Sequence, residues 1–505
     1  MKFLPLLLAV LLCAGCMHAP PREVPASPLN FGDGQILPLP ENGELSLTQA
    51  VHLSLQRNPD LAVQWLEPAL AAYDVQREEA GFNSVLFGGT RYGEEVSSET
   101  SRSTSERFSV EAESRESELG LRRNFSSGTE LELSVSEQDD QSNRAPSQQE
   151  LRAGIGLTQS LLRGRGTEVN RISIRQAQLG VDISIEELRA YTQALIAETE
   201  IAYWQLQLAQ EAVEITRKAL EVADQQLSEI QQRIEIGDLA PDERYAAEAE
   251  RSNRRKNLTD ATANLREREL ILAGLLDIDP LPASPYRLRS TLELAETPIQ
   301  DPAPFIEQAL RLNPALREAR TRLLQNELEV VRTRNGVLPR LDFFARLDKT
   351  GFGEDASSAR EEFSGDTYEW VAGFELLQDL GNSEALANRE QASLEREQAE
   401  RAVKNMELRI INQLRRAVVE YNRTLEQAAI SRETLRLRRA TAEAEMARFE
   451  VGTSTSLLVA QAQREALESE IEVLELRIAY RTALVRLQEL TGELLNRYGV
   501  EISRQ

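Results

Sequence analysis

Apolar residues recur at alternating spacings of four and three along a stretch that contains almost no helix breakers. Between Thr167 and Ile236 the sequence has no proline and one interior glycine, Gly180. This stretch predicts a helix of about 70 residues, which spans about 105 Å at the standard rise. Its second half carries a heptad seam, made of Ala202, Leu206, Ala209, Val213, Thr216, Leu220, Ala223, Leu227, Ile230 and Ile234. The pattern predicts an extended coiled coil and not a compact domain.

A second apolar line runs beside this seam and also repeats every seven residues. It consists of Ile201, Leu208, Ile215 and Val222. Two adjacent seams allow one helix to pack between two neighbours in a curved wall. The spacing recurs in Leu467, Ile471, Leu474, Ile478 and Val485, and more weakly in Tyr421, Ala428, Leu435, Ala442 and Phe449. The same periodicity is also typical of a rod-shaped coiled-coil scaffold of the cell envelope that contains no channel.

Shorter segments alternate between apolar and polar residues and predict strands. They lie at about 84–95, 150–159, 339–348 and 366–377. An insertion at 96–150, rich in Ser and Glu, alternates again around Val110 and Leu133, which predicts an additional hairpin. Four short strands do not close a barrel by themselves. Either three chains supply four strands each, twelve in all, or the strands form a small soluble β-domain.

The order of these elements occurs twice along the chain. Asn58-Pro59 and Asn313-Pro314 each begin a helical stretch, and the motif around Gly237 matches the motif around Gly452. The first predicted repeat, 45–277, ends in a short helix at 241–276. A linker at 278–302 leads to the second repeat, 303–492, which has a long helix at about 384–449 and a short helix at 456–491. A tail follows at 493–505. Gly237 and Gly452 are expected as left-handed C-caps. Each therefore marks the tip of a helical hairpin that points away from the strands.

Composition excludes several classes of function. The chain has 58 Lys and Arg against 82 Asp and Glu, a formal charge of −24, so it is a poor nucleic-acid binder. The cysteines are Cys13 and Cys16 alone, and there are two histidines. The sequence also lacks a phosphate loop, a Gly-x-Ser-x-Gly motif and a zinc motif. We therefore expect no enzyme, no catalytic residue, no metal site and no cofactor. The pair Asp139-Asp140 is interpreted as solvated charge in a polar loop.

The N-terminus has the features of an export signal. Residues 1–15 combine one positive charge, an apolar run and small residues, and Ala14-Gly15-Cys16 resembles a bacterial lipoprotein box. Cys13 stands where that box usually has Leu, and an ordinary cleaved signal is the alternative to acylation of Cys16. Met17 replaces the Asp that often retains such proteins at the inner membrane, which favours the outer membrane. The proline-rich segment 16–44 predicts an extended tether.

Together these features resemble the TolC-like outer-membrane efflux proteins, of the lipoprotein type, over residues 45–492. The matching motifs are the paired Asn-Pro starts, Leu338-Pro339, Leu161-Leu162-Arg163-Gly164, Leu380-Gly381-Asn382 and Val451-Gly452-Thr453. The resemblance implies a mainly α protein with a β-barrel. In that architecture a duplicated module of helix, β-hairpin, long helix and short helix forms a homotrimer. Its twelve-stranded outer-membrane barrel continues into a periplasmic α-helical coiled-coil tube.

The resemblance also implies a function and partners. Such proteins are passive exit channels, anchored in outer-membrane lipid with a large periplasmic portion, and they serve an inner-membrane pump of the RND or ABC type through a periplasmic adaptor. The tips that contact the adaptor in the family correspond to Ile236, Gly237, Asp238, Leu239, Val451, Gly452, Thr453 and Ser454. The cargo is either small molecules or exported protein. Small molecules are favoured, because lipidated relatives often serve pumps that export small molecules.

Some relatives close the periplasmic entrance with aspartates shortly after the second tip. Here those positions hold Leu458 and Gln461, so the acidic ring is missing there. Glu243, after the first tip, compensates only in part. We therefore hypothesise an apolar gate at Leu457 and Leu458; alternatively, these leucines only pack the hairpin.

Overall fold

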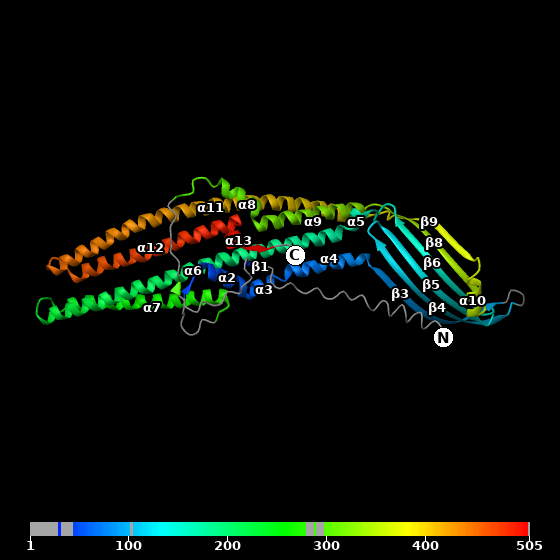
Figure 1. Ribbon diagram of the computed structural model, residues 1–505, viewed down its shortest axis with the longest axis horizontal. Coiled ribbons are helices and arrows are strands. Elements are labelled where there is room, and N and C mark those ends of the chain that lie inside the picture. The colour runs from blue at the N-terminus through cyan, green and yellow to red at the C-terminus, as the bar shows by residue number, and fades with distance from the viewer. Residues whose placement is uncertain (1–28, 32–43, 101–104, 279–286, 289–296, 503–505) are drawn as a thin grey trace.

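The computed structural model describes residues 29–31, 44–100, 105–278, 287–288 and 297–502. The molecule is elongated, with a sheet at one end and two helical hairpins reaching the other (Figure 1). The predicted signal segment and Cys16 lie outside the described residues.

The helices follow the same order in both halves of the chain. The first half contains α2 (Leu47–Arg57), α3 (Pro59–Gln64), α4 (Glu67–Glu79) and the 3-10 helix η1 (Ala80–Phe82), then, after the strands, α5 (Thr167–Asn170), α6 (Ile172–Glu235) and α7 (Glu243–Leu276). The second half contains α8 (Ala303–Leu312), α9 (Pro314–Gly336), α11 (Ser383–Glu450), α12 (Ser456–Thr491) and α13 (Leu494–Arg497). The first long helix is interrupted at Arg171, whose backbone (φ −103°, ψ 9°) departs from the helical conformation.

The two Asn-Pro motifs explain how each half begins. The side chain of Asn58 accepts a hydrogen bond from the N–H of Leu61 (2.9 Å), and Asn313 accepts one from the N–H of Leu316 (3.2 Å). Each asparagine caps a helix whose first residue is proline, where the missing N–H costs nothing. The repeated dipeptide therefore starts a helix in the same way at α3 and at α9.

The heptad seam holds the long helices against their neighbours. Buried positions of the α6 seam are Ala202, Leu206, Ala209, Val213, Thr216, Ala223 and Ile230. Helix α6 packs along α7, and α11 packs along α12. The second apolar line is less covered within one chain: Ile201, Leu208 and Ile215 are half-buried and Val222 is exposed. One side of the helical wall therefore still presents apolar positions.

Six strands form one antiparallel sheet in the order β3-β4-β5-β6-β8-β9. They are β3 (Ser84–Thr100), β4 (Arg107–Phe125), β5 (Thr129–Ser142), β6 (Gln148–Ser160), β8 (Arg340–Gly353) and β9 (Tyr368–Leu377). The hairpin β4–β5 is the one expected in the insertion at 96–150. The resemblance implied four strands per chain, and the sheet has six, because this hairpin pairs with strands on both of its sides. The polar stretch between β8 and β9 contains a short helix, α10 (Ala356–Phe363).

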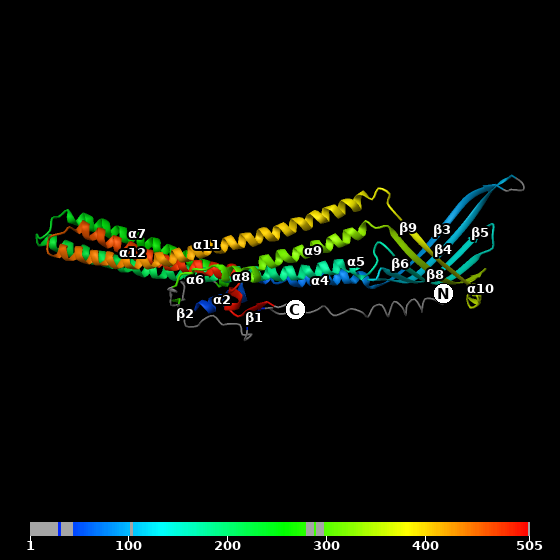
Figure 2. The ribbon, with the colours of Figure 1, turned by 90° about the horizontal axis from the view of Figure 1, so that it is seen from above.

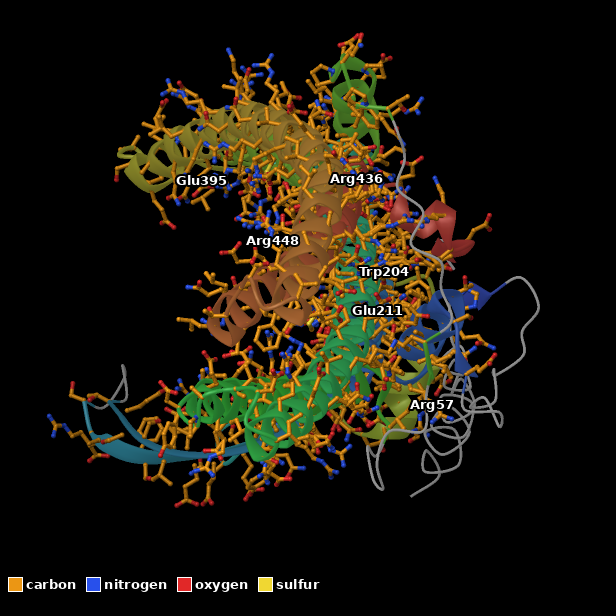
Figure 3. All side chains as sticks on the ribbon, turned by 90° about the vertical axis from the view of Figure 1, so that its left-hand side faces the viewer. Arg57, Trp204, Glu211, Glu395, Arg436 and Arg448 are labelled. Atoms are coloured by element: carbon orange, nitrogen blue, oxygen red, sulfur yellow. The ribbon has the colours of Figure 1, made fainter. Side chains whose placement is uncertain are left out.

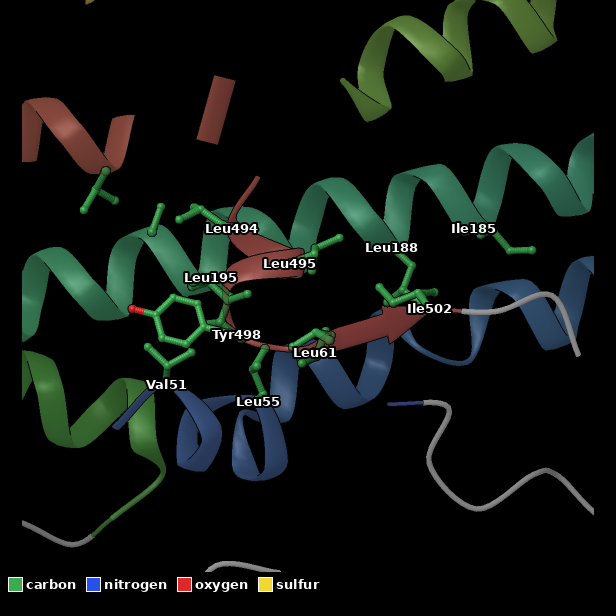
Figure 4. Close-up of a cluster of buried hydrophobic side chains, with 14 residues drawn as sticks. Val51, Leu55, Leu61, Ile185, Leu188, Leu195, Leu494, Leu495, Tyr498 and Ile502 are labelled. Atoms are coloured by element: carbon green, nitrogen blue, oxygen red, sulfur yellow. The ribbon is translucent and has the colours of Figure 1, made fainter. Parts of the chain in front are cut away.

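A compact hydrophobic core (Figure 4) lies where both halves of the chain meet, near the middle of the long axis in Figure 1. It gathers buried side chains of α2, α3, α6 and the C-terminal α13 and β10 (Val500–Ile502), among them Leu55, Leu195 and Leu494. Strand β10 pairs antiparallel with β1 (Leu29–Phe31), and β2 (Glu44–Leu45) pairs parallel with β7 (Arg287–Leu288). The first and last described segments thus pair with each other, and α2 and α13 both pack on α6.

Among the helices of the described residues, none combines the length and the apolar composition that crossing a membrane requires.

Candidate functional site

The register of the sheet places apolar side chains of all six strands on one face. One row across the sheet consists of Leu86, Leu121, Leu133, Ile155, Leu347 and Trp370, each paired with the next. Directly paired residues of antiparallel strands project to the same side. All six side chains are between 39% and 67% exposed. This apolar face continues through Leu157, Phe374 and Leu376. In the described part of the chain, α10 packs on one end of it, beside Gly351 and Gly353 of β8.

The opposite face of the same strands is polar and charged. Arg122 of β4 donates to Glu132 of β5 at 2.7 Å, and Arg346 lies 2.8 Å from Asp348 within β8. Arg152 of β6 forms an ion pair with Glu150 at 2.7 Å and a longer one with Asp348 at 3.9 Å. These charges lie one residue out of phase with the apolar row, because successive side chains of a strand point to opposite faces.

The two faces differ as the two sides of a membrane channel wall do. A soluble chain rarely exposes so large a continuous apolar surface. An alternation that is apolar on one face and ion-paired on the other fits a sheet with lipid on one side and water on the other. A small soluble β-domain would leave the apolar row facing water.

The opposite end of the molecule carries two tips with the same backbone geometry. Gly237 (φ +80°) follows α6 and Gly452 (φ +76°) follows α11. The N–H of Asp238 bonds the carbonyl of Arg233, and the N–H of Thr453 bonds the carbonyl of Arg448, both at 2.8 Å. Glycine is favoured at each position, since residues with a Cβ pay a steric cost in the left-handed backbone conformation.

At each tip an apolar side chain next to the glycine is free of the chain's own core. Ile236 is 79% exposed and Val451 is 74% exposed. Leu239, by contrast, packs against the small cluster of Ile230, Phe449 and Val459. That cluster joins the two tips, because its members come from α6, α11 and α12. The remaining tip positions are the exposed Gly237, Asp238, Gly452 and Thr453 and the half-buried Ser454.

Three of the four gate candidates lie just after the second tip, and the fourth, Glu243, follows the first tip. Leu457 and Leu458 are 56% and 47% exposed, so about half of each residue is uncovered within one chain. Gln461 is also exposed. Glu243 is half-buried and accepts a hydrogen bond from the hydroxyl of Ser456. This contact connects the starts of α7 and α12, and it ties Glu243 to the adjacent hairpin.

Viewed from the tip end, the helices follow an arc and not a closed bundle (Figure 3). Seen from above, the sheet lies at the end of the long axis opposite the tips (Figure 2). One chain therefore forms a segment of a curved wall along its whole length.

Two buried polar clusters are not apparent from the sequence alone. Glu250 and Arg254 of α7 form a 2.7 Å ion pair that is almost fully buried, and Arg464 of α12 reaches Glu250 at 2.9 Å. Burial lowers the pKa of Arg254, against the opposing effect of Glu250. The spacing of four residues between Glu250 and Arg254 was visible, but only the packing of α12 makes the pair internal.

The second cluster lies in the middle of the molecule around Glu200, which is 1% exposed. Its carboxylate accepts hydrogen bonds from Tyr498 (2.9 Å) and Trp204 (3.4 Å), and Arg497 lies 3.6 Å away. Nothing in the local sequence distinguishes Glu200 from the exposed glutamates of the same helix.

The interpretation of Asp139-Asp140 as a loop was wrong, since both residues belong to β5.

Comparison with known proteins supports this geometry. The model of the family described as outer membrane efflux protein matches residues 50–276 and 305–493. Outer membrane protein TolC of Vibrio cholerae is 25% identical over 385 residues, which are 72% of this chain and 82% of that protein.

Solved channels have the same fold. The CmeC outer membrane channel of Campylobacter jejuni aligns with a TM-score of 0.65 at 17% identity, over 91% of this chain and 87% of CmeC. The open state of the MtrE outer membrane channel of Neisseria gonorrhoeae aligns with a TM-score of 0.63 at 16% identity, over 91% of each chain. The two segments matched by the family model cover most of both halves, so this chain belongs to the outer membrane efflux protein family.

Proposed function

We propose that three copies of this outer-membrane efflux channel assemble into a passive exit duct that catalyses no reaction. The observation that carries the proposal is the two-faced sheet, which has an exposed apolar side, an ion-paired side and two edge strands. A non-channel coiled-coil scaffold has no use for such a sheet. In the duct, the apolar face of the sheet contacts lipid and the charged face contacts water.

The edge strands are suited to pairing between copies. β3 and β9 are the outermost strands of the described sheet, and six alternating strands make them run in opposite directions. A neighbour's β9 therefore lies antiparallel to β3 and continues the sheet. In lipid each unpaired backbone group costs several kcal/mol, so closing the sheet with further copies removes a large penalty.

The helical wall supports the same assembly. The line of Ile201, Leu208, Ile215 and Val222 is only partly covered within one chain. A neighbouring copy that packs on this line buries it and extends the arc of Figure 3 into a tube.

The tips are proposed as the docking site of a periplasmic adaptor, which connects the duct to an inner-membrane pump of the RND or ABC type. Ile236 and Val451 are the apolar anchors of this site, because both are largely exposed beside a rigid glycine turn. Acylation of Cys16 would add a lipid anchor at the outer membrane. We assign small molecules as the cargo, with exported protein as the alternative that the partner pump decides.

The test is to extract the full-length protein from outer membranes and measure its mass by light scattering and its shape by electron microscopy. A hollow tube of three chains, with ion conductance after insertion into planar bilayers, is the expected result. A water-soluble monomer or a solid rod without conductance would refute the duct. It would favour the scaffold.

A further inference from the structure

The hairpin β4–β5 distinguishes this chain from the four-stranded plan that the family resemblance implies. We propose that the outer-membrane wall of this channel contains eighteen strands, because each of three copies inserts this hairpin into the wall. The inference rests on the proposed trimer. It concerns the width of the pore, which the trimer alone does not fix.

The first argument is that the hairpin is paired along its whole length on both sides. β4 pairs with β3 from Ser84↔Arg123 to Thr100↔Arg107, and β5 pairs with β6 from Thr129↔Gln159 to Asp140↔Gln148. If the hairpin lay outside the wall, β3 would instead pair with β6. The observed order leaves no register in which β3 and β6 are neighbours.

The second argument is that the hairpin has the same two faces as the rest of the sheet. Leu121 and Leu133 continue the apolar row from Leu86 to Ile155 without a break. On the other face, Arg122 and Glu132 form the ion pair that crosses from β4 to β5. A hairpin surrounded by water would have no reason to match the apolar face of its neighbours in phase.

The third argument is that the turn of the hairpin is fixed to the base of the helical wall. The carbonyl of Ser127 accepts a hydrogen bond from the N–H of Gly166 (3.0 Å), and that of Gly128 accepts one from Ser160 (2.9 Å). Asn170 of α5 donates from its side chain to the carbonyl of Ser126 at 3.1 Å. The hairpin is thus anchored where the strands meet the helices, as a wall strand must be.

Two consequences for the pore follow. The diameter of a barrel grows roughly linearly with the number of strands, so eighteen strands give a pore about one and a half times as wide as twelve. The hairpin also makes the inner wall acidic. Its charged-face residues include one arginine, Arg122, and the five carboxylates Glu116, Glu118, Glu130, Glu132 and Asp140. We therefore infer a wide outer exit that favours cationic and bulky cargo over anionic cargo.

Strand counting in the assembled protein is the direct test. Electron cryomicroscopy of the full-length protein in nanodiscs should show eighteen strands in the membrane wall. A trimer with twelve strands and a detached hairpin would overturn this inference and leave the proposed duct intact. An assembly that is not a hollow trimer would overturn both.

A labelling experiment tests the position of the hairpin independently. The only natural cysteines lie within the first sixteen residues, so a cysteine introduced in β5 reports on its own surroundings. Ser136→Cys lies on the charged face and Val135→Cys on the apolar face. In outer-membrane vesicles a hydrophilic maleimide should label Ser136→Cys and not Val135→Cys. Equal labelling of the two would place the hairpin outside the wall.

Deletion of residues 107–142 removes both strands of the hairpin and leaves β3 connected to β6. Polymers of graded size, added from the outer side during conductance recordings, should be excluded at a smaller size by the deletion variant than by the natural chain. An unchanged exclusion limit would overturn the contribution of the hairpin to pore width. If the deletion variant does not fold, the paired cysteine variants still decide the question.

Discussion

The hydroxyl of Tyr498 donates a 2.9 Å hydrogen bond to Glu200, although the two residues are 298 positions apart in the sequence. Tyr498 follows α13 near the C-terminus, whereas Glu200 lies inside α6. The bond fixes the end of the chain to the middle of the longest helix of the first half.

Replacing this tyrosine tests the contribution of the bond. Tyr498→Phe should destabilise the protein by about 1.5–3 kcal/mol, because the buried carboxylate of Glu200 loses a donor. The measurement is the unfolding midpoint of the detergent-solubilised protein. Tyr73→Phe is the matched control, since Tyr73 is 46% exposed, and it should leave the midpoint unchanged. Equal midpoints for Tyr498→Phe and the natural chain would contradict the prediction.

The same residue predicts a dependence on pH. Burial, and secondarily the nearby Glu200, raises the pKa of Tyr498 above its ordinary value of 10.0. The folded protein therefore keeps a proton that the unfolded chain releases, so this stabilisation is complete below pH 10 and declines above it. Between pH 9 and 11 the midpoint of the natural chain should fall more steeply than that of Tyr498→Phe. Parallel slopes would count against the assignment.

Gly128 tests how the hairpin is anchored. It has φ +84°, and an added Cβ would come within 2.3 Å of the carbonyl oxygen of Gly164. Gly128→Ala should cost at least about 1–2 kcal/mol for the left-handed backbone alone, and more for the clash. The yield of folded, heat-modifiable protein on gels should drop. Gly89→Ala, where an added Cβ meets no atom within 4 Å, is the control and should fold normally.

Two adjacent positions of β5 test which face contacts lipid. Leu133→Arg places a charge on the apolar face and should destabilise the inserted protein by about 2–4 kcal/mol if it lies near the middle of the bilayer. Ser134→Arg, one residue along, faces the charged side and should be tolerated. Unfolding in lipid vesicles by urea measures both. Greater damage from Ser134→Arg would reverse the assignment of the faces.

The gate hypothesis makes a prediction at the second tip. Leu458→Ala removes an exposed apolar side chain just after the second tip, where the hypothesis places the gate, and should increase single-channel conductance. Leu437→Ala, on a comparably exposed position of α11 away from the tip, serves as the control. If conductance of the Leu458→Ala channel stays at the natural value, an apolar gate at this position is ruled out.

Local patterns in the sequence determined much of this protein. The absence of proline and the seven-residue repeat specify the long helices, since each turn of such a helix depends on neighbours within four residues. Asn58-Pro59, Asn313-Pro314, Gly237 and Gly452 specify starts and ends of helices for equally local reasons, and their backbone geometry follows the expectation. Alternation also indicated the additional hairpin within 96–150.

Only the tertiary structure decided how distant segments combine. That β4 and β5 enter between β3 and β6 depends on register between strands, which a single segment does not encode. The burial of Glu200 and of the Glu250–Arg254 pair depends on α12, α13 and the C-terminus packing across α6 and α7, so these residues resemble ordinary surface charges in the sequence. A contact between distant segments depends on both of the surfaces that meet, and the local sequence of either segment describes only its own surface.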